Sequence, residues 1–198
     1  PSATAAIVPH AAEQMAAWYD GLKIEIRDTD TEAIIEMLLR GQADVGIVSG
    51  TPSVKGVQGS LLFQDEFGLT CAMDHPLAAH TGDMTLADAK AYDFVGNNLC
   101  RDIKSARLKH ALTHTQLHAH NTLSLIGILQ IGKRFTILPR AVVQQLPARL
   151  AFRALSDLDA KRSVSVLISE RSSQIDLAWE FTATLRAVWT DRDLLLGH

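Results

Sequence analysis

The chain has few of the residues and patterns that mark specialised classes of protein. It contains only 2 cysteines in 198 residues, Cys71 and Cys100. They form neither a CxxC pair nor a zinc-ligand spacing, so we interpret them as free thiols in a reducing cytoplasm. The 19 basic and 22 acidic residues give a net charge of −3 and form no basic stripe that could follow phosphates. The 198-residue chain is therefore not expected to bind nucleic acid by itself.

Long apolar runs and catalytic signatures are also missing. No window of about 18 apolar residues predicts a membrane span, and residues 1–10 have no leader pattern. The sequence contains no GxGxxG, Walker, HExxH or GxSxG motif. Cys71, Asp74 and His75 are close in CAMDH, but adjacency on a strand supplies no base or helix N-terminus to activate a thiolate. We expect no catalytic residue, no cofactor and no membrane partner.

What the sequence does contain is a 47% hydrophobic content and an alternation of helix and strand patterns. The alternation predicts βαβ units and a mostly parallel α/β fold. Residues 121–132 are apolar on nearly every side and are expected to form a buried helix. Helices are predicted over 11–21, 29–41 with a Thr29–Glu32 capping box, 85–93 capped by Thr85, 121–132, 141–146 and 174–189. Strands are predicted over 22–28, 43–50, 61–74, 94–98, 134–139 and 163–169.

Half of the 8 histidines lie close together, at His110, His114, His118 and His120. In one continuous helix the first three would share a face, at a spacing that lets imidazoles bind zinc. The pattern changes to strand-like alternation over 115–121, which predicts that the helix ends near His114. The cluster then divides into a helical pair and a strand pair without a carboxylate or thiol at ligand spacing. We interpret it as solvated or partly packed histidines, with no metal site.

Small polar residues recur where predicted strands meet predicted helices. Hydroxyl and amide groups beside a helix N-terminus can hold a small anion, and open α/β sheets bind ligands at the carboxyl ends of their strands. The alternative is that each residue only caps its helix. The residues are Ser2, Thr4, Thr29, Thr31, Asn97, Asn98, Asn121 and Thr122.

Three segments, taken in order, resemble the effector-binding domain of LysR-type transcriptional regulators. Residues 32–50 resemble that family's helix, closing glycine and Asp-led strand. Residues 61–78 resemble its crossover strand followed by HisProLeu, and residues 123–143 resemble its buried helix, glycine turn and LeuPro. The matching positions are Gly41, Asp44, His75, Pro76, Leu77, Gly132, Leu138 and Pro139. Together the segments cover nearly the whole chain.

The resemblance implies two interleaved Rossmann-like subdomains of the periplasmic-binding-protein type II kind. Subdomain I would comprise 1–70 and 167–198, and subdomain II would comprise 71–166, with a small anionic effector in the cleft between them. It also implies a homodimer through this domain, a tetramer of the full-length protein, and DNA binding only through an N-terminal domain. That domain and the family's first strand would precede residue 1.

The resemblance and the polar pattern together give a candidate effector site. Arg101 is its cationic candidate, with a solvated loop residue as the alternative. The predicted effector-binding residues are Ser2, Thr4, Thr31, Ser49, Asn98, Arg101 and Thr122. Two other functions remain open at this point. One is a free-standing solute-binding protein of the same fold, which an upstream export signal would reveal; the other is a metal- or cysteine-dependent enzyme.

Overall fold

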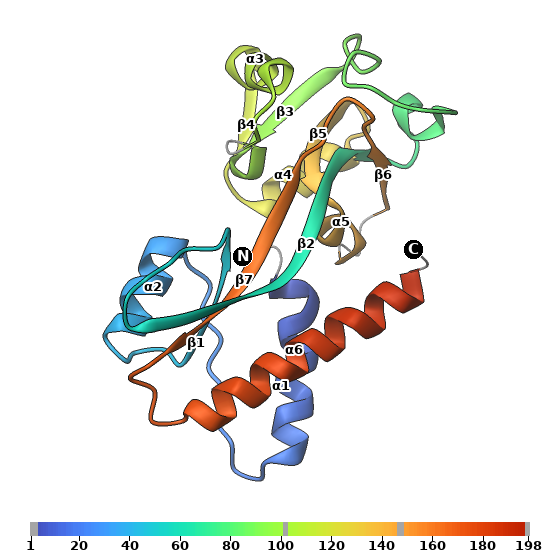
Figure 1. The fold of residues 1–198 in the computed structure, drawn as a ribbon. Coiled ribbons are helices and arrows are strands. Elements are labelled where there is room, and N and C mark those ends of the chain that lie inside the picture. Colours follow the sequence, from blue (N-terminus) through green and yellow to red (C-terminus); the bar gives the residue numbers. More distant parts are fainter. Residues whose placement is uncertain (1–3, 101–102, 146–148, 197–198) are drawn as a thin grey trace. The chain divides into compact units, whose positions relative to one another are not determined.

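The computed structural model describes residues 4–100, 103–145 and 149–196, which form a mixed α/β protein (Figure 1). The chain divides into two compact units. Unit 1 comprises residues 1–64 and 163–198, and unit 2 comprises Asp65–Arg162. Unit 2 is therefore an insertion into unit 1, which the chain leaves along β2 (Val57–Ala72) and re-enters along β7 (Lys161–Ser169).

In unit 1, strands β1 (Val45–Ser49) and β7 pair antiparallel and the first part of β2 continues the sheet, with helices on both faces. Val45 lies opposite Ile168 and Ser49 opposite Val164. On one face Val164 and Val166 pack with α1 (Thr4–Trp18) and α6 (Ile175–Leu196). On the other face Leu167 packs with α2 (Thr31–Leu39). Burial on both faces explains the continuous apolar run Val166, Leu167 and Ile168 within β7.

The predicted strand over residues 22–28 does not form. These residues follow a glycine with positive φ, Gly21, and run as an irregular segment with Ile24 39% and Ile26 59% exposed. Alternation makes a segment suitable for a strand, but a strand also needs the edge of a neighbour to pair with. Among the described strands β1 lies at the end of the order, so its second edge is unpaired, but a cavity lies between that strand and residues 22–28, which stay outside the sheet.

Unit 2 contains the larger part of the sheet, and its pairing is mixed rather than mostly parallel. Strand β2 pairs antiparallel with β5 (Arg134–Pro139) and β6 (Leu150–Ala154), and the sequence did not predict β6. Strand β3 (Asp93–Asn97) pairs in parallel with β5 and with β4 (Leu117–Ala119). One face carries a core with α3 (Ala106–His114), and the other a core with α4 (Thr122–Gln130) and α5 (Arg140–Gln145).

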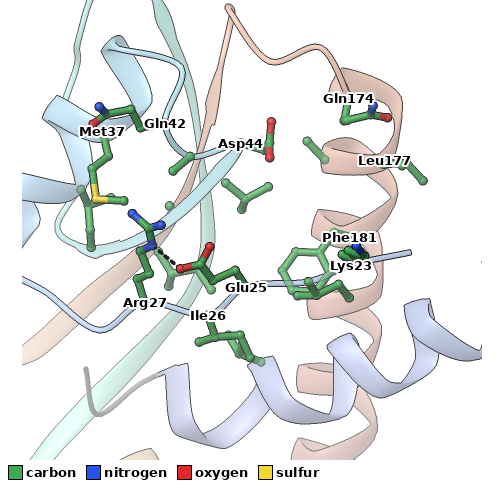
Figure 2. Close-up of a pocket in the computed structure, with 18 of the residues that line it drawn as sticks. Lys23, Glu25, Ile26, Arg27, Met37, Gln42, Asp44, Gln174, Leu177 and Phe181 are labelled. Atoms are coloured by element: carbon green, nitrogen blue, oxygen red, sulfur yellow. Dashed lines mark hydrogen bonds and ion pairs between the residues drawn. The ribbon is translucent and has the colours of Figure 1, made fainter. Parts of the chain in front are cut away.

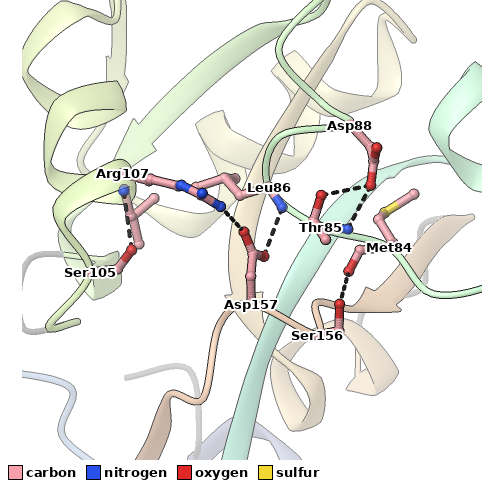
Figure 3. Close-up of polar contacts among 9 residues, drawn as sticks. Met84, Thr85, Leu86, Asp88, Ser105, Arg107, Ser156 and Asp157 are labelled. Atoms are coloured by element: carbon pink, nitrogen blue, oxygen red, sulfur yellow. Dashed lines mark hydrogen bonds and ion pairs between the residues drawn. The ribbon is translucent and has the colours of Figure 1, made fainter.

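Two predicted helices differ from the structure. Residues 85–93 form turns instead of a helix, although Thr85 makes the expected cap contacts, its amide and hydroxyl both donating to Asp88 Oδ2 (Figure 3). The Leu86 amide donates to Asp157 Oδ1 at 2.9 Å, which holds this segment against residues 156–157. Helix α4 forms as predicted, but only one side is buried, since Leu123 is 82% exposed.

The helix caps and the histidine segment test finer predictions. The N-cap of α2 is Asp30, whose carboxylate accepts the Ala33 amide at 2.8 Å, so the capping box predicted from Thr29 is wrong. Helix α3 ends at His114 and residues 117–119 form β4, which confirms the predicted break in the histidine cluster. Within the described ranges, no helix is both long and apolar enough to cross a membrane.

Candidate functional site

The carboxyl ends of three strands meet at one edge of unit 2. Strands β4 and β5 both run parallel to β3, with Asn97 opposite Ala119 and Phe94 opposite Phe135. Each strand is followed directly by a helical segment: η2 (Asn98–Cys100), α4 or α5. The edge therefore places Asn98 and Thr122, the first residues of η2 and α4, on the side of the sheet where open α/β proteins bind ligands.

Asn97 supports this edge from inside. It is 3% exposed, and its Nδ2 donates to Thr136 Oγ1 at 2.8 Å and to the Ile137 carbonyl at 3.0 Å. Its Oδ1 accepts the Leu99 amide at 2.9 Å, which fixes the turn that starts η2. Asn97 is thus committed to internal hydrogen bonds, while the adjacent Asn98 is exposed.

The N-terminus of α4 is suited to a negative ligand. Its N-cap is Asn121, whose Oδ1 accepts the Ser124 amide at 2.8 Å, and Thr122 is the partly exposed first helical residue. The first turn of any helix leaves backbone amides unpaired and carries a partial positive charge. Because Asn121 is neutral, that charge is not offset by the cap.

Unit 1 places two more candidates at one end of a helix–strand pair. Only residues 40–44 join α2 to β1, and a Cβ added at Gly46 would lie 2.4 Å from Ile34 and 3.0 Å from Leu38. Helix α2 therefore runs back along β1, which puts its start, Thr31, at the same end as Ser49. Here the cap is the acidic Asp30, so this helix N-terminus is less favourable for an anion than that of α4.

A cavity of about 390 Å³ lies elsewhere in unit 1 (Figure 2). It lies between residues 22–28 and the edge strand β1, and α1, α2 and α6 contribute to its walls. Its lining is apolar at Met37 and Phe181, and Arg27 Nε pairs with Glu25 Oε1 at 2.6 Å. Neither Thr31 nor Ser49 lines this cavity. It adjoins the segment that fails to become a strand, and it is separate from the predicted effector residues.

The cysteines and His75 have structural environments. Cys71 and Cys100 are fully buried, and burial raises the pKa of Cys71 to about 11 and the pKa of Cys100 to about 12. Both thiols are therefore protonated and weakly nucleophilic near neutral pH. The His75 ring accepts the Leu77 amide through Nδ1 at 3.1 Å and caps η1 (Pro76–Ala79), and burial lowers the pKa of His75.

Comparison with known families shows which family the chain matches. The profile of the LysR substrate-binding domain matches residues 1–190. The chain belongs to the LysR substrate-binding domain family. No curated protein sequence matches it.

Solved structures show the fold that this LysR substrate-binding domain adopts. The reduced OxyR regulatory domain from Pseudomonas aeruginosa matches with a TM-score of 0.74 and 17% identity over 92% of each chain. The BenM effector-binding domain with its effector benzoate matches with a TM-score of 0.73 and 17% identity, over 96% of this chain and 89% of that one. Full-length BenM matches with a TM-score of 0.73 and 16% identity, over 96% of this chain and 65% of that one. The predicted fold class, of the periplasmic-binding-protein type II kind, is confirmed.

The seven predicted effector residues fall into three groups in the LysR substrate-binding domain. Thr31 and Ser49 share one end of unit 1, and Asn98 and Thr122 share one edge of unit 2. Ser2 and Arg101 lie outside the described residues. Thr4 begins α1, but its side chain is outside the described part of the chain.

Two buried hydroxyls were missed as candidates. Ser165 Oγ and Thr70 Oγ1 are buried and have no hydrogen-bond partner within the described ranges. Ser165 on β7 lies opposite Val48, the residue that precedes Ser49 on β1. Thr70 on β2 lies opposite Thr136 on β5. Buried hydroxyls without a partner are exceptions in folded proteins, and a bound water or ion is one way in which they are satisfied. The available signal was a hydroxyl residue between two apolar residues of a strand, as Ser165 lies between Val164 and Val166.

Proposed function

We propose that this LysR substrate-binding domain senses a small anionic metabolite and controls the conformation of a DNA-bound oligomer. The observation that carries the proposal is the family match over residues 1–190. The solved BenM domain supports the chemical class, because its named effector, benzoate, is a small carboxylate. We infer that the LysR substrate-binding domain itself performs no catalysis.

The polar ends of the two units give the effector its contacts. The start of α4 offers unpaired amides and the Thr122 hydroxyl beside a neutral cap, and Asn98 adds an exposed amide at the same edge. Thr31 and Ser49 supply hydroxyls from unit 1. That residues of both units, together with Ser2, Thr4 and Arg101, contact one effector stays a prediction. Such a ligand shifts a conformational equilibrium only by its differential affinity for the two states.

The assembly and location follow from the family rather than from the site. We infer a cytoplasmic homodimer formed through this domain, and a tetramer of the full-length regulator. The chain spans 65% of full-length BenM. We assign DNA binding to a separate N-terminal domain. The ligand would thus act on DNA indirectly, through the arrangement of these domains.

The test is a thermal-shift screen of the 198-residue protein against small aliphatic and aromatic carboxylates, amino acids and inorganic anions. A ligand present at 100 times its Kd stabilises the folded state by about 2.7 kcal/mol. Hits are then repeated with Thr31→Val and Thr122→Val, which remove a hydroxyl at nearly constant volume, and with Ser49→Ala, which removes a hydroxyl without adding atoms. We expect each variant to weaken binding of the hit.

The matched control is Thr113→Val, at an exposed hydroxyl near the end of α3 that bonds only to the Lys109 carbonyl among the described contacts. This variant should bind the hit as tightly as the wild type. A hit that binds equally well to all four variants would place its site away from the proposed residues. A hit confined to cationic or neutral compounds would contradict the anionic class.

A further inference from the structure

The end of α3 presents two imidazoles on its solvent-exposed surface. His110 and His114 are both exposed and lie one helical turn apart, with ring centroids 4.0 Å apart. Helix α3 ends at His114, so His110 and His114 lie on the same helix, while His118 and His120 lie beyond its end. Of the three histidines spaced four residues apart in the sequence, the structure therefore keeps two, His110 and His114, on one helix face.

A hydrogen bond fixes the orientation of one ring. His114 Nδ1 lies 2.8 Å from the backbone carbonyl oxygen of His110. A carbonyl can only accept, so Nδ1 must carry the proton and donate it. In the neutral ring the lone pair is then on Nε2, which is free to bind a metal ion. Histidines that ligate metals commonly donate their second ring nitrogen to a backbone carbonyl in this way.

The surrounding charge does not oppose a cation strongly. The C-terminal end of a helix carries a partial negative charge, and His114 is in the last turn of α3. Arg107, one turn before His110, donates to Asp157 Oδ2 at 2.6 Å, so its charge is paired (Figure 3). Lys109 is the exposed unpaired cation of the same helix in the described contacts.

We propose that His110 and His114 form a two-imidazole site for a divalent transition-metal ion of the borderline class. The described residues contain no group of three or more histidine, cysteine or carboxylate side chains placed for one metal ion. Water fills the remaining coordination positions, which makes the site open and exchangeable rather than structural. Imidazole ligands and the usual stability order favour Cu²⁺ over Ni²⁺ and Zn²⁺. This site is independent of the proposed effector site.

The second histidine pair, His118 and His120, is a control for metal binding by His110 and His114. His118 and His120 flank Ala119 at the end of β4, are also exposed, and have ring centroids 5.7 Å apart. A Cβ added at Gly96 would lie 2.4 Å from the His118 ring, so this ring packs over the neighbouring strand. The two pairs match in residue type and exposure but differ in spacing and orientation.

The experiment is calorimetric titration of Cu²⁺ into the 198-residue protein in a non-coordinating buffer, with electron paramagnetic resonance of the bound ion. We expect one equivalent with two imidazole nitrogens in its hyperfine pattern. His110→Ala and His114→Ala should each weaken binding at least tenfold and leave one nitrogen. His118→Ala with His120→Ala should change the affinity less than twofold. Circular dichroism checks that the exposed substitutions leave the fold intact.

Two results would overturn the proposal. One is wild-type affinity in the combined His110→Ala and His114→Ala variant. The other is loss of the tight equivalent when His118 and His120 are replaced while His110 and His114 remain. Ni²⁺ and Zn²⁺ titrations add a check, since both should bind more weakly than Cu²⁺ and lose binding in the same variants.

Discussion

The first and last residues of unit 2, Asp65 and Arg162, form a buried ion pair. Removing one partner should destabilise the fold much more than replacing both. Asp65 is 5% and Arg162 8% exposed, and Arg162 Nη2 donates to Asp65 Oδ2 at 3.0 Å. Asp65 Oδ1 also accepts the Ala141 amide at 3.1 Å, at the start of α5. Asp65→Ala leaves a buried guanidinium without its carboxylate and should lower the free energy of unfolding by about 3–5 kcal/mol.

Replacing both partners should be much milder. Burial raises the pKa of Asp65 and lowers the pKa of Arg162, so desolvation opposes both charges in the folded state. Among the described contacts, Asp65→Leu with Arg162→Leu leaves only the Ala141 amide without its partner, a loss of about 1–3 kcal/mol that the relief of desolvation partly offsets. Urea unfolding followed by tryptophan fluorescence measures both variants. A double variant less stable than Asp65→Ala would refute the reasoning.

Three further predictions concern other buried groups. Burial raises the pKa of the Asp65 carboxyl in the folded protein. The contribution of Asp65 to stability is therefore complete below its unfolded pKa, about 4, and is lost as the pH rises through its folded pKa. The free energy of unfolding of the wild type, relative to that of the double leucine variant, should be larger at about pH 4 than at about pH 7. Cys71 and Cys100 should not react with a disulfide reagent at pH 8 in the native protein and should both react in urea; reaction of either thiol in the native protein would contradict their burial. Asn97→Leu should lower the free energy of unfolding by about 2–3 kcal/mol, whereas Asn98→Leu should change it by less than about 0.5 kcal/mol; equal effects in urea unfolding would argue against the internal hydrogen bonds of Asn97.

Patterns that depend on local burial were read correctly from the sequence. Strand β5 has the predicted bounds, Arg134–Pro139, and the bounds of α2, β1 and α4 lie within one or two residues of their predicted positions. The end of α3 near His114 was also predicted, because the change from helical to alternating spacing is itself a local signal. The family followed from the order of three such segments, and the profile over residues 1–190 confirms it.

The errors arose where the outcome depends on a distant neighbour. Residues 22–28 have a strand pattern, but no pattern within them reports whether the fold brings them within hydrogen-bonding reach of another strand. Residues 85–93 have a helix start, yet the Leu86 amide bonds to Asp157, which is 71 positions away in the chain. At the candidate site, Asn97 and Asn98 look alike in sequence. Only the fold shows that Asn97 is buried by internal partners while Asn98 is exposed.

The insertion of unit 2 also sets an order of events during synthesis. Strand β1 has β7 as its described partner, and α1 packs with α6, but both partners leave the ribosome only after all of residues 65–162. Unit 2 is continuous and can complete its own sheet while the first half of unit 1 still has an open strand edge. Because chains fold as they emerge from the N-terminus, the nascent protein passes through an interval in which a chaperone or a neighbouring nascent chain can reach that edge.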